Sequence, residues 1–118
     1  MILDLKQVPN IFVICGKTDL RKGIDGLATL VTEEYGMDPF DQSLFLFCGS
    51  QPNRFKALYW DTTGFILLYK RFENGKLQWP NNKDEIKQLT FDQVDRLLSG
   101  LAIIEKRTVA PAKVGSFY

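Results

Sequence analysis

The residues that could do chemistry in this sequence are basic and aromatic side chains, most of them between positions 54 and 71. The candidate phosphate contacts are six cations: Arg21, Lys22, Arg54, Lys56, Lys70 and Arg71. A candidate interaction surface consists of three aromatic residues: Trp60, Phe65 and Tyr69. Cations bind phosphates and flat rings stack on unpaired bases, so this combination is typical of a sheet that binds single-stranded nucleic acid. The alternative is that the rings form a second core layer under the last helix, with the cations in solvent at the sheet edge.

The positive charge of the chain is local rather than general. The whole chain has a formal net charge of +1, well short of the basic excess of a typical nucleic-acid-binding domain. Residues 54–76 contain five Lys or Arg residues and two acids, and we expect Glu73 and Lys76 to pair across a turn. Any site for a polyanion must therefore be a local patch.

The sequence offers little for catalysis. It contains no histidine, which excludes a Ser-His-Asp triad and a Cys/His zinc site. Asp61 is expected to accept backbone hydrogen bonds in a turn, and Asp25 to pair with Arg21 or Lys22 on a helix surface. The segment 16–23 lacks the glycine spacing of a phosphate-binding loop. We expect a protein that is not an enzyme and that uses no cofactor and no metal.

The cysteines and the ends of the chain indicate the compartment. Cys15 and Cys48 each end an apolar run and are followed by Gly, so we expect buried free thiols at strand ends. The N-terminus lacks the pattern of a signal peptide, and no apolar segment approaches the roughly 18 residues of a membrane span. The sequence therefore predicts a cytoplasmic protein without a membrane segment.

A sheet between Leu44 and Pro80 must position the basic and aromatic residues. Four runs rich in Leu, Ile, Phe, Tyr and Trp read as antiparallel strands, and Ile11 to Cys15 as a further buried strand. Asn74-Gly75 favours a type I′ hairpin turn, and residues 61–64 close the hairpin before it.

A two-residue loop at Thr62-Thr63 would place Trp60 opposite Phe65 and Arg54 opposite Arg71. Alternation then assigns one set of side chains to a core face covered by the first helix: Phe55, Ala57, Tyr59, Ile66, Leu68, Phe72, Leu77 and Trp79. The second face carries the remaining set: Trp60, Phe65, Leu67, Tyr69, Arg54, Lys56, Arg71 and Gln78.

Two helices flank the sheet in the sequence. Apolar spacing of three and four residues predicts a helix of about 16 residues between Thr18 and Tyr35, capped by Thr18 or Asp19. Thr90 and Gln93 have the form of a capping box for a short helix that ends at Gly100. The predicted fold is a single α+β domain over residues 1–104, with an antiparallel sheet of four to five strands, one long helix on a face and a short C-terminal helix. Residues 105–118 are predicted to be a flexible basic tail.

Three segments together resemble a known family: DLRKGIDGLATLV, LFLFCGSQPNRFKALYWDTTGFILLYKRFENGKLQWP and LTFDQVDRLLSGL. They strongly resemble the TnpB accessory proteins, the orf2-like proteins of the bacterial insertion sequence sixty-six family, which are unrelated to the RNA-guided nuclease of the same name. The resemblance extends from about Asp19 to Leu101, and LYWD, GFxLxYKR and the closing WP are its most specific motifs.

The resemblance implies a non-catalytic accessory role in DNA transposition, beside a larger transposase encoded by the same element. It implies DNA contact through the six cations named above. The alternative is an interaction module that docks the transposase or self-associates without binding DNA. One departure weakens the case for DNA: the family usually has an arginine-rich loop after Phe-Cys, whereas here Gly-Ser-Gln-Pro-Asn separates Cys48 from Arg54. The resemblance leaves the oligomeric state open.

Overall fold

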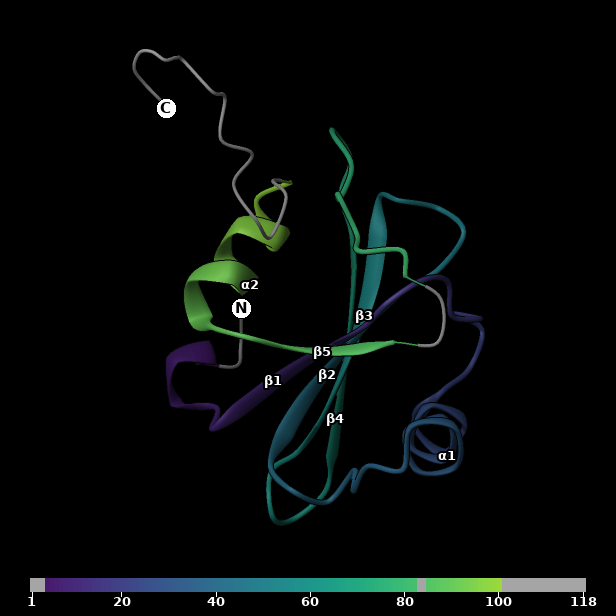
Figure 1. Cartoon of the computed structure of the whole chain (residues 1–118), viewed down its shortest axis with the longest axis vertical. Coiled ribbons are helices and arrows are strands. Elements are labelled where there is room, and N and C mark those ends of the chain that lie inside the picture. The colour runs from purple at the N-terminus through teal and green to yellow at the C-terminus, as the bar shows by residue number, and fades with distance from the viewer. Residues whose placement is uncertain (1–3, 83–84, 101–118) are drawn as a thin grey trace.

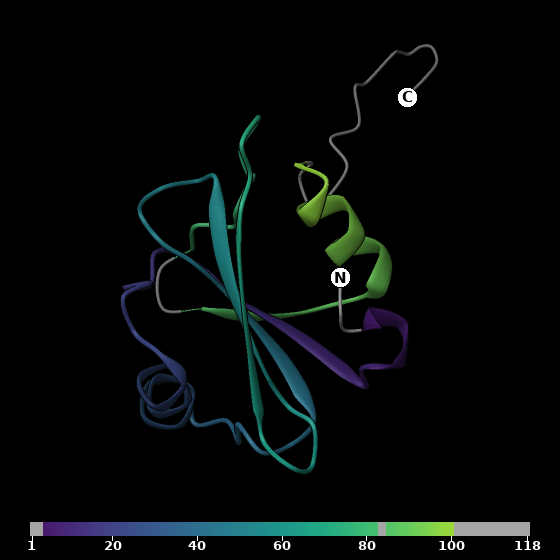
Figure 2. The same cartoon turned by 180° about the vertical axis from the view of Figure 1, so that it is seen from behind.

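The computed structural model describes residues 4–82 and 85–100, in which one sheet separates two helices (Figures 1 and 2). The sheet has the strand order β4-β3-β2-β1-β5. Its strands are β1 (Asn10–Ile14), β2 (Ser43–Cys48), β3 (Arg54–Trp60), β4 (Phe65–Arg71) and β5 (Ile86–Leu89). The helices are a short 3-10 turn, η1 (Leu5–Gln7), and two α-helices, α1 (Ile24–Tyr35) and α2 (Phe91–Leu98). The predicted α+β class is confirmed.

The sheet is mixed rather than purely antiparallel. β1 and β2 run parallel, with Ile11 opposite Leu44 and Val13 opposite Leu46, whereas the other neighbouring pairs are antiparallel. The chain between β1 and β2 contains α1, and a crossover of this length is what a parallel pair requires. The parallel pair places the loops that follow β1 and β2 at the same edge of the sheet.

The β3–β4 hairpin has the predicted register. Trp60 lies opposite Phe65 and Arg54 opposite Arg71, with a two-residue loop at Thr62-Thr63. Asp61 closes this loop: its side chain accepts hydrogen bonds from the backbone N–H groups of Thr63 and Gly64, both at 3.0 Å. Asp61 is therefore a turn residue, as predicted. The same hydrogen bonds, first that from the Thr63 N–H, lower the pKa of its carboxyl.

The prediction of a strand directly after the Asn74-Gly75 turn is wrong. The chain after β4 instead crosses the end of the sheet, where the N–H of Leu77 donates to the carbonyl of Pro52 at 2.6 Å. The indole N–H of Trp79 donates to the carbonyl of Ile14 at 2.9 Å. These contacts hold the segment across the strand ends, and the chain then forms β5 against β1. β4 is therefore an edge strand.

Helix α1 is shorter than predicted. It has 12 residues and begins after Gly23, with no side-chain capping bond at its N-terminus. Thr18, one of the predicted caps, is held instead by its own N–H, which donates to the carbonyl of Cys48 at 2.7 Å. Asp19, the other, accepts hydrogen bonds from Arg21. Residues 17–23 consequently form an irregular loop.

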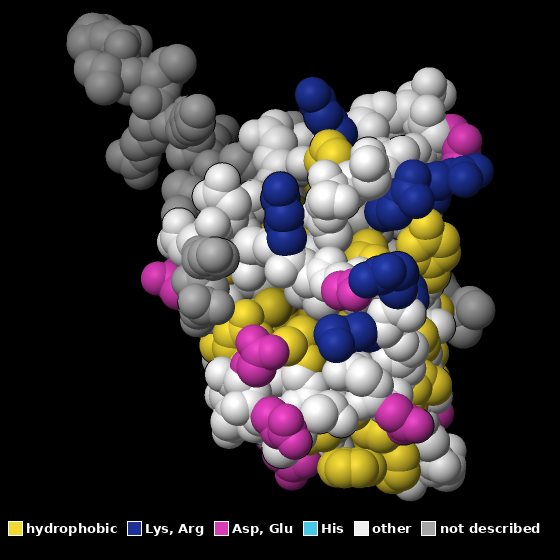
Figure 3. All heavy atoms as spheres, turned by 90° about the vertical axis from the view of Figure 1, so that its right-hand side faces the viewer, with side chains coloured by type: hydrophobic (Ala, Val, Ile, Leu, Met, Phe, Trp, Pro, Cys, Tyr) yellow, Lys and Arg dark blue, Asp and Glu magenta, His cyan; other side chains and the backbone are white. Residues whose placement is uncertain are grey.

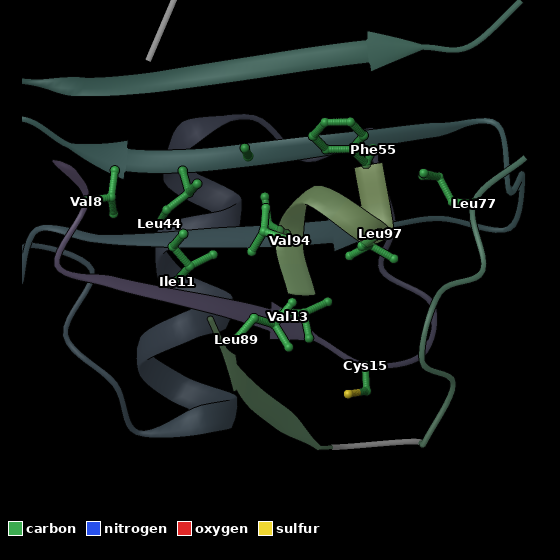
Figure 4. Packing of buried hydrophobic residues seen from close by; sticks show 12 residues of the cluster. Val8, Ile11, Val13, Cys15, Leu44, Phe55, Leu77, Leu89, Val94 and Leu97 are labelled. Atoms are coloured by element: carbon green, nitrogen blue, oxygen red, sulfur yellow. The ribbon is translucent and has the colours of Figure 1, made fainter. Parts of the chain in front are cut away.

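The two faces of the sheet are covered by different helices, in the reverse of the predicted assignment. The predicted core face is covered by α2, whose Val94 and Leu97 are fully buried against Phe55, Ala57 and neighbouring side chains (Figure 4). Helix α1 covers the second face, where Leu27 and Val31 pack on Phe45, Phe47 and Leu58. Phe65 and Leu67 also pack against this second cluster.

Helix α2 begins with the predicted capping box. The hydroxyl of Thr90 accepts from the N–H of Gln93 at 3.2 Å, and the Gln93 side chain accepts from the N–H of Thr90 at 2.9 Å. The predicted tail lies outside the described residues. In the described part of the chain, no helix has the length and apolar character needed to cross a membrane.

Candidate nucleic-acid interface

A cavity of about 750 Å³ opens on the α1 side of the sheet, among two loops and the strands β3 and β4. Four cations line it: Lys17, Arg21, Arg54 and Lys56. The remaining lining is mixed, with apolar and aromatic groups beside loop residues: Thr18, Asp19, Leu20, Gly49, Ser50, Gln51, Leu67 and Tyr69. We call this site the basic cavity.

The topology explains why the basic cavity lies where it does. Loop 17–23 follows β1 and loop 49–53 follows β2, and the two strands are parallel neighbours. Both loops therefore leave the same edge of the sheet, where the hydrogen bond from Thr18 to the Cys48 carbonyl joins them. Gly49 allows this approach, because a Cβ at its position would lie 3.0 Å from Cγ of Leu20.

Lys56 ties the first loop to the sheet. Its Nζ donates to the carbonyl oxygen of Lys22 at 2.9 Å, across 34 positions of sequence. The same Nζ lies 5.8 Å from the centroid of the Tyr69 ring, directly opposite it on β4. The ammonium of Lys56 therefore both positions the loop and adds positive charge beside an aromatic ring.

Arg21 and Asp19 form the charged rim of the cavity. Nε of Arg21 donates to Oδ1 of Asp19 at 3.0 Å, and Nη2 donates to Oδ2 at 2.9 Å. The Arg21 side chain is 91% exposed. Hydrogen bonds from Arg21 lower the pKa of Asp19 to about 2. The predicted pairing of Arg21 with Asp25 is wrong, because Asp19 binds the guanidinium fork.

Charge is distributed unevenly over this side of the molecule (Figure 3). Lys and Arg side chains gather over the upper half of the view, around a hydrophobic area, whereas most Asp and Glu side chains lie in the lower half. Helix α1 accounts for part of the acidic half, since it carries Asp25, Glu33 and Glu34. An anion would therefore be drawn to the end of the face that holds the basic cavity.

The structure brings together half of the predicted phosphate contacts. Arg21, Arg54 and Lys56 line the basic cavity. Lys22 lies next to it, where its carbonyl oxygen accepts the hydrogen bond from Lys56. Lys70 is on the α2 side of the sheet, with Nζ 4.9 Å from the centroid of Phe72.

Arg71 lies outside the lining of the basic cavity. It pairs with Glu73 at 2.8 Å, so the predicted pairing of Glu73 with Lys76 is wrong. A residue two positions away along the same segment reaches the carboxylate more directly than one beyond the turn does.

The predicted aromatic set is also divided. Tyr69 lines the basic cavity and is 53% exposed. Trp60 and Phe65 lie at the opposite end of the hairpin, 5.0 Å apart between centroids, and Phe40 packs on both. Phe40 was absent from the prediction because it lies outside every predicted strand. We call Phe40, Trp60 and Phe65 the aromatic cluster.

Sequence reasoning missed Lys17 and the loop residues 49–51. Lys17 directly follows Gly16 at the end of an apolar run, and Gly49 follows Cys48 in the same way. The repeated pattern of a strand, a glycine and a polar loop was the available signal. It becomes informative only when the two strands are known to be parallel neighbours.

The two cysteines are buried free thiols, as predicted. Burial is the main cause that raises the pKa of both, so each remains a neutral thiol near pH 7. Residues 4–82 and 85–100 contain no group of three or more Cys, Asp or Glu side chains that could hold a metal ion.

Comparison with known proteins decides the family. The family described as "IS66 Orf2 like protein" matches residues 9–108. The chain belongs to this family. The resemblance seen in the sequence is confirmed, and membership implies that this IS66 Orf2-like protein has an accessory role in an insertion sequence.

Two relatives come from Sinorhizobium fredii (strain NBRC 101917 / NGR234). The uncharacterized protein y4jC is 32% identical over 108 residues, which cover 89% of this chain and 92% of the relative. The uncharacterized protein y4hO is 32% identical over 110 residues, which cover 92% of this chain and 96% of the relative. No solved structure matches the IS66 Orf2-like chain.

Proposed function

We propose that this protein is a non-catalytic accessory factor in transposition and that it contacts DNA through the basic cavity. One observation carries the proposal: the fold collects Lys17, Arg21, Arg54 and Lys56 around one cavity, although they come from separate parts of the chain. Successive phosphates of a DNA backbone present closely spaced negative charges that such a group can neutralise. Under this proposal the element-encoded transposase does the chemistry, in the cytoplasm, and this chain holds DNA.

The contact is expected to be modest in strength. Asp19 lies within the group and accepts two hydrogen bonds from the Arg21 guanidinium, so a phosphate must share or displace that carboxylate. Loop 49–53 contributes backbone and small polar groups rather than cations. Binding should therefore weaken along a shallow slope as salt rises, because each neutralised phosphate contributes only about 0.9 to the slope of log affinity against log salt.

A second candidate function is docking of the transposase through the aromatic cluster. Phe40 is 54% exposed, although its ring packs 4.9 Å from Trp60 and 5.2 Å from Phe65 between centroids. Aromatic residues exposed together are enriched at protein interfaces. This site lies at the other end of the hairpin from Arg54, so the two functions can be separated by mutation.

Charge reversal tests the DNA contact. The double variant Arg21→Glu with Arg54→Glu should reduce affinity for labelled DNA from the ends of the element by at least about tenfold. The matched control, Lys70→Glu with Lys76→Glu, changes the net charge equally but alters no residue that lines the basic cavity. Equal losses in both variants would show that DNA responds only to net charge, and the proposed site would be wrong.

The docking function has its own test. Replacing Phe40 with Ser should abolish capture of the purified transposase and leave DNA affinity unchanged. Capture that survives this change would remove the aromatic cluster as the docking site. Circular dichroism of each variant establishes that the fold is intact.

A further inference from the structure

The basic cavity has a floor and a rim of different chemistry. Leu20, Leu67 and Tyr69 supply apolar and aromatic surface, whereas Arg21 and Arg54 supply guanidinium groups. Leu20 and Leu67 are half-buried, and they pack against the cluster beneath α1. Tyr69 keeps 53% of its surface exposed. A ligand that suits the whole cavity must have a flat or apolar part joined to an anion.

The volume of about 750 Å³ fits one small unit of a polymer or a drug-sized molecule. A nucleotide has the required composition, because a flat base is joined through its sugar to phosphates. Base stacking on an aromatic ring is the usual way in which proteins hold single strands without reading sequence. The ammonium of Lys56 lies over the Tyr69 ring, 5.8 Å from its centroid, so it adds positive charge next to this aromatic surface.

Duplex DNA fits this arrangement less well. Its bases are stacked inside the helix, and its phosphates lie on a convex outer surface. A duplex could touch the exposed Arg21, but it could not place the face of a base on Tyr69 without flipping a nucleotide out, which costs a few kcal/mol. An unpaired strand exposes the base and the phosphate at the same time.

We propose that the basic cavity binds an unpaired nucleotide of single-stranded DNA. The base lies against Tyr69 and Leu67, and the two phosphates that flank it lie at Arg21 and Arg54. The inference rests on the proposed function and deepens it, because it specifies which form of DNA the protein holds.

Fluorescence anisotropy with an oligothymidylate and a blunt duplex of equal phosphate number tests this inference. The full chain should bind the single strand at least about tenfold more tightly than the duplex at the same salt. Tyr69→Leu should lower single-strand affinity by about tenfold, the effect of losing one stacked base, and leave duplex affinity unchanged. Tyr69→Phe keeps the ring and should retain the affinity of the unaltered protein.

Phe40→Leu is the matched control, since Phe40 is 54% exposed and lies outside the basic cavity. It should leave both affinities unchanged. Equal or tighter binding of the duplex, or an unaltered single-strand affinity in Tyr69→Leu, would overturn the inference while DNA binding itself stands. Failure to bind either form at low salt would overturn the proposed function as well.

Discussion

Nζ of Lys56 donates a hydrogen bond to the carbonyl oxygen of Lys22 at 2.9 Å, which joins β3 to the loop that precedes α1. The bond holds one wall of the basic cavity to the sheet, because Lys56 lines the cavity and Lys22 belongs to loop 17–23, whose residues 17–21 also line it. One of the predicted phosphate contacts is therefore also a structural tie. The ammonium of Lys56 already donates one hydrogen bond within the protein before any ligand binds.

Lys56→Gln should loosen this loop without unfolding the sheet. The shorter, neutral side chain cannot reach the Lys22 carbonyl, so we expect the free energy of unfolding to fall by about 1 kcal/mol. Amide hydrogen exchange should rise within residues 17–23 and stay unchanged in β2. Unchanged exchange in the loop would show that Lys56 does not hold it.

Gly49→Ala should disturb the wall of the basic cavity by crowding Leu20. The added Cβ would lie 3.0 Å from Cγ and 3.3 Å from Cδ1 of Leu20, so the side chain must move. We expect the free energy of unfolding to fall by about 1 kcal/mol. We would measure the free energy of unfolding in urea for Gly49→Ala, Leu20→Ala and the double variant. The double variant should lose less stability than the two single variants lose in sum. Losses that add exactly would contradict a contact between the new methyl group and Leu20.

Arg21→Gln should raise the pKa of Asp19 from about 2 toward 3.8, because hydrogen bonds from Arg21 are the leading cause of its depression. A carboxyl whose folded pKa is depressed stabilises the fold above its unfolded pKa, and this contribution disappears as the pH falls from about 3.8 through 2. The stability of the variant should therefore change less with pH in that window than the stability of the unaltered protein does. Carboxyl NMR titration measures the shift; a midpoint that stays near 2 in the variant would contradict the assignment.

The β3–β4 hairpin shows what could be predicted from sequence. Its register followed from a short turn at Thr62-Thr63 and from alternating side chains, both of which are local. The capping box of α2 is local for the same reason, since Thr90 and Gln93 are three residues apart. Features that depend on residues within one element or one turn could thus be predicted from the sequence.

Contacts between distant segments could not be predicted in this way. Alternation divided the strands into two faces, but it did not say which helix covers which face, and that assignment was wrong. The crossing segment that holds Trp79 against Ile14 joins residues 65 positions apart. The favourable turn sequence Asn74-Gly75 suggested a further strand, but the tertiary contacts of Leu77 and Trp79 decided the path.

The candidate site divides in the same way. Arg54, Lys56 and Tyr69 were expected on one face, because the hairpin register places them there. Lys17 was missed, because its position at the cavity depends on the parallel pairing of β1 with β2. Lys70 was included, although one step of alternation puts it on the other face of the sheet.

The salt dependence of DNA binding tests the central claim most directly. Affinity of the unaltered protein and of the Arg21→Glu, Arg54→Glu variant for one labelled duplex from the element's end would be measured over a series of salt concentrations. If both residues neutralise phosphates, the slope of log affinity against log salt should become shallower by about 1.8 in the variant, since each lost contact removes about 0.9. Equal slopes for the two proteins would contradict the assignment of the basic cavity as the DNA-contacting site.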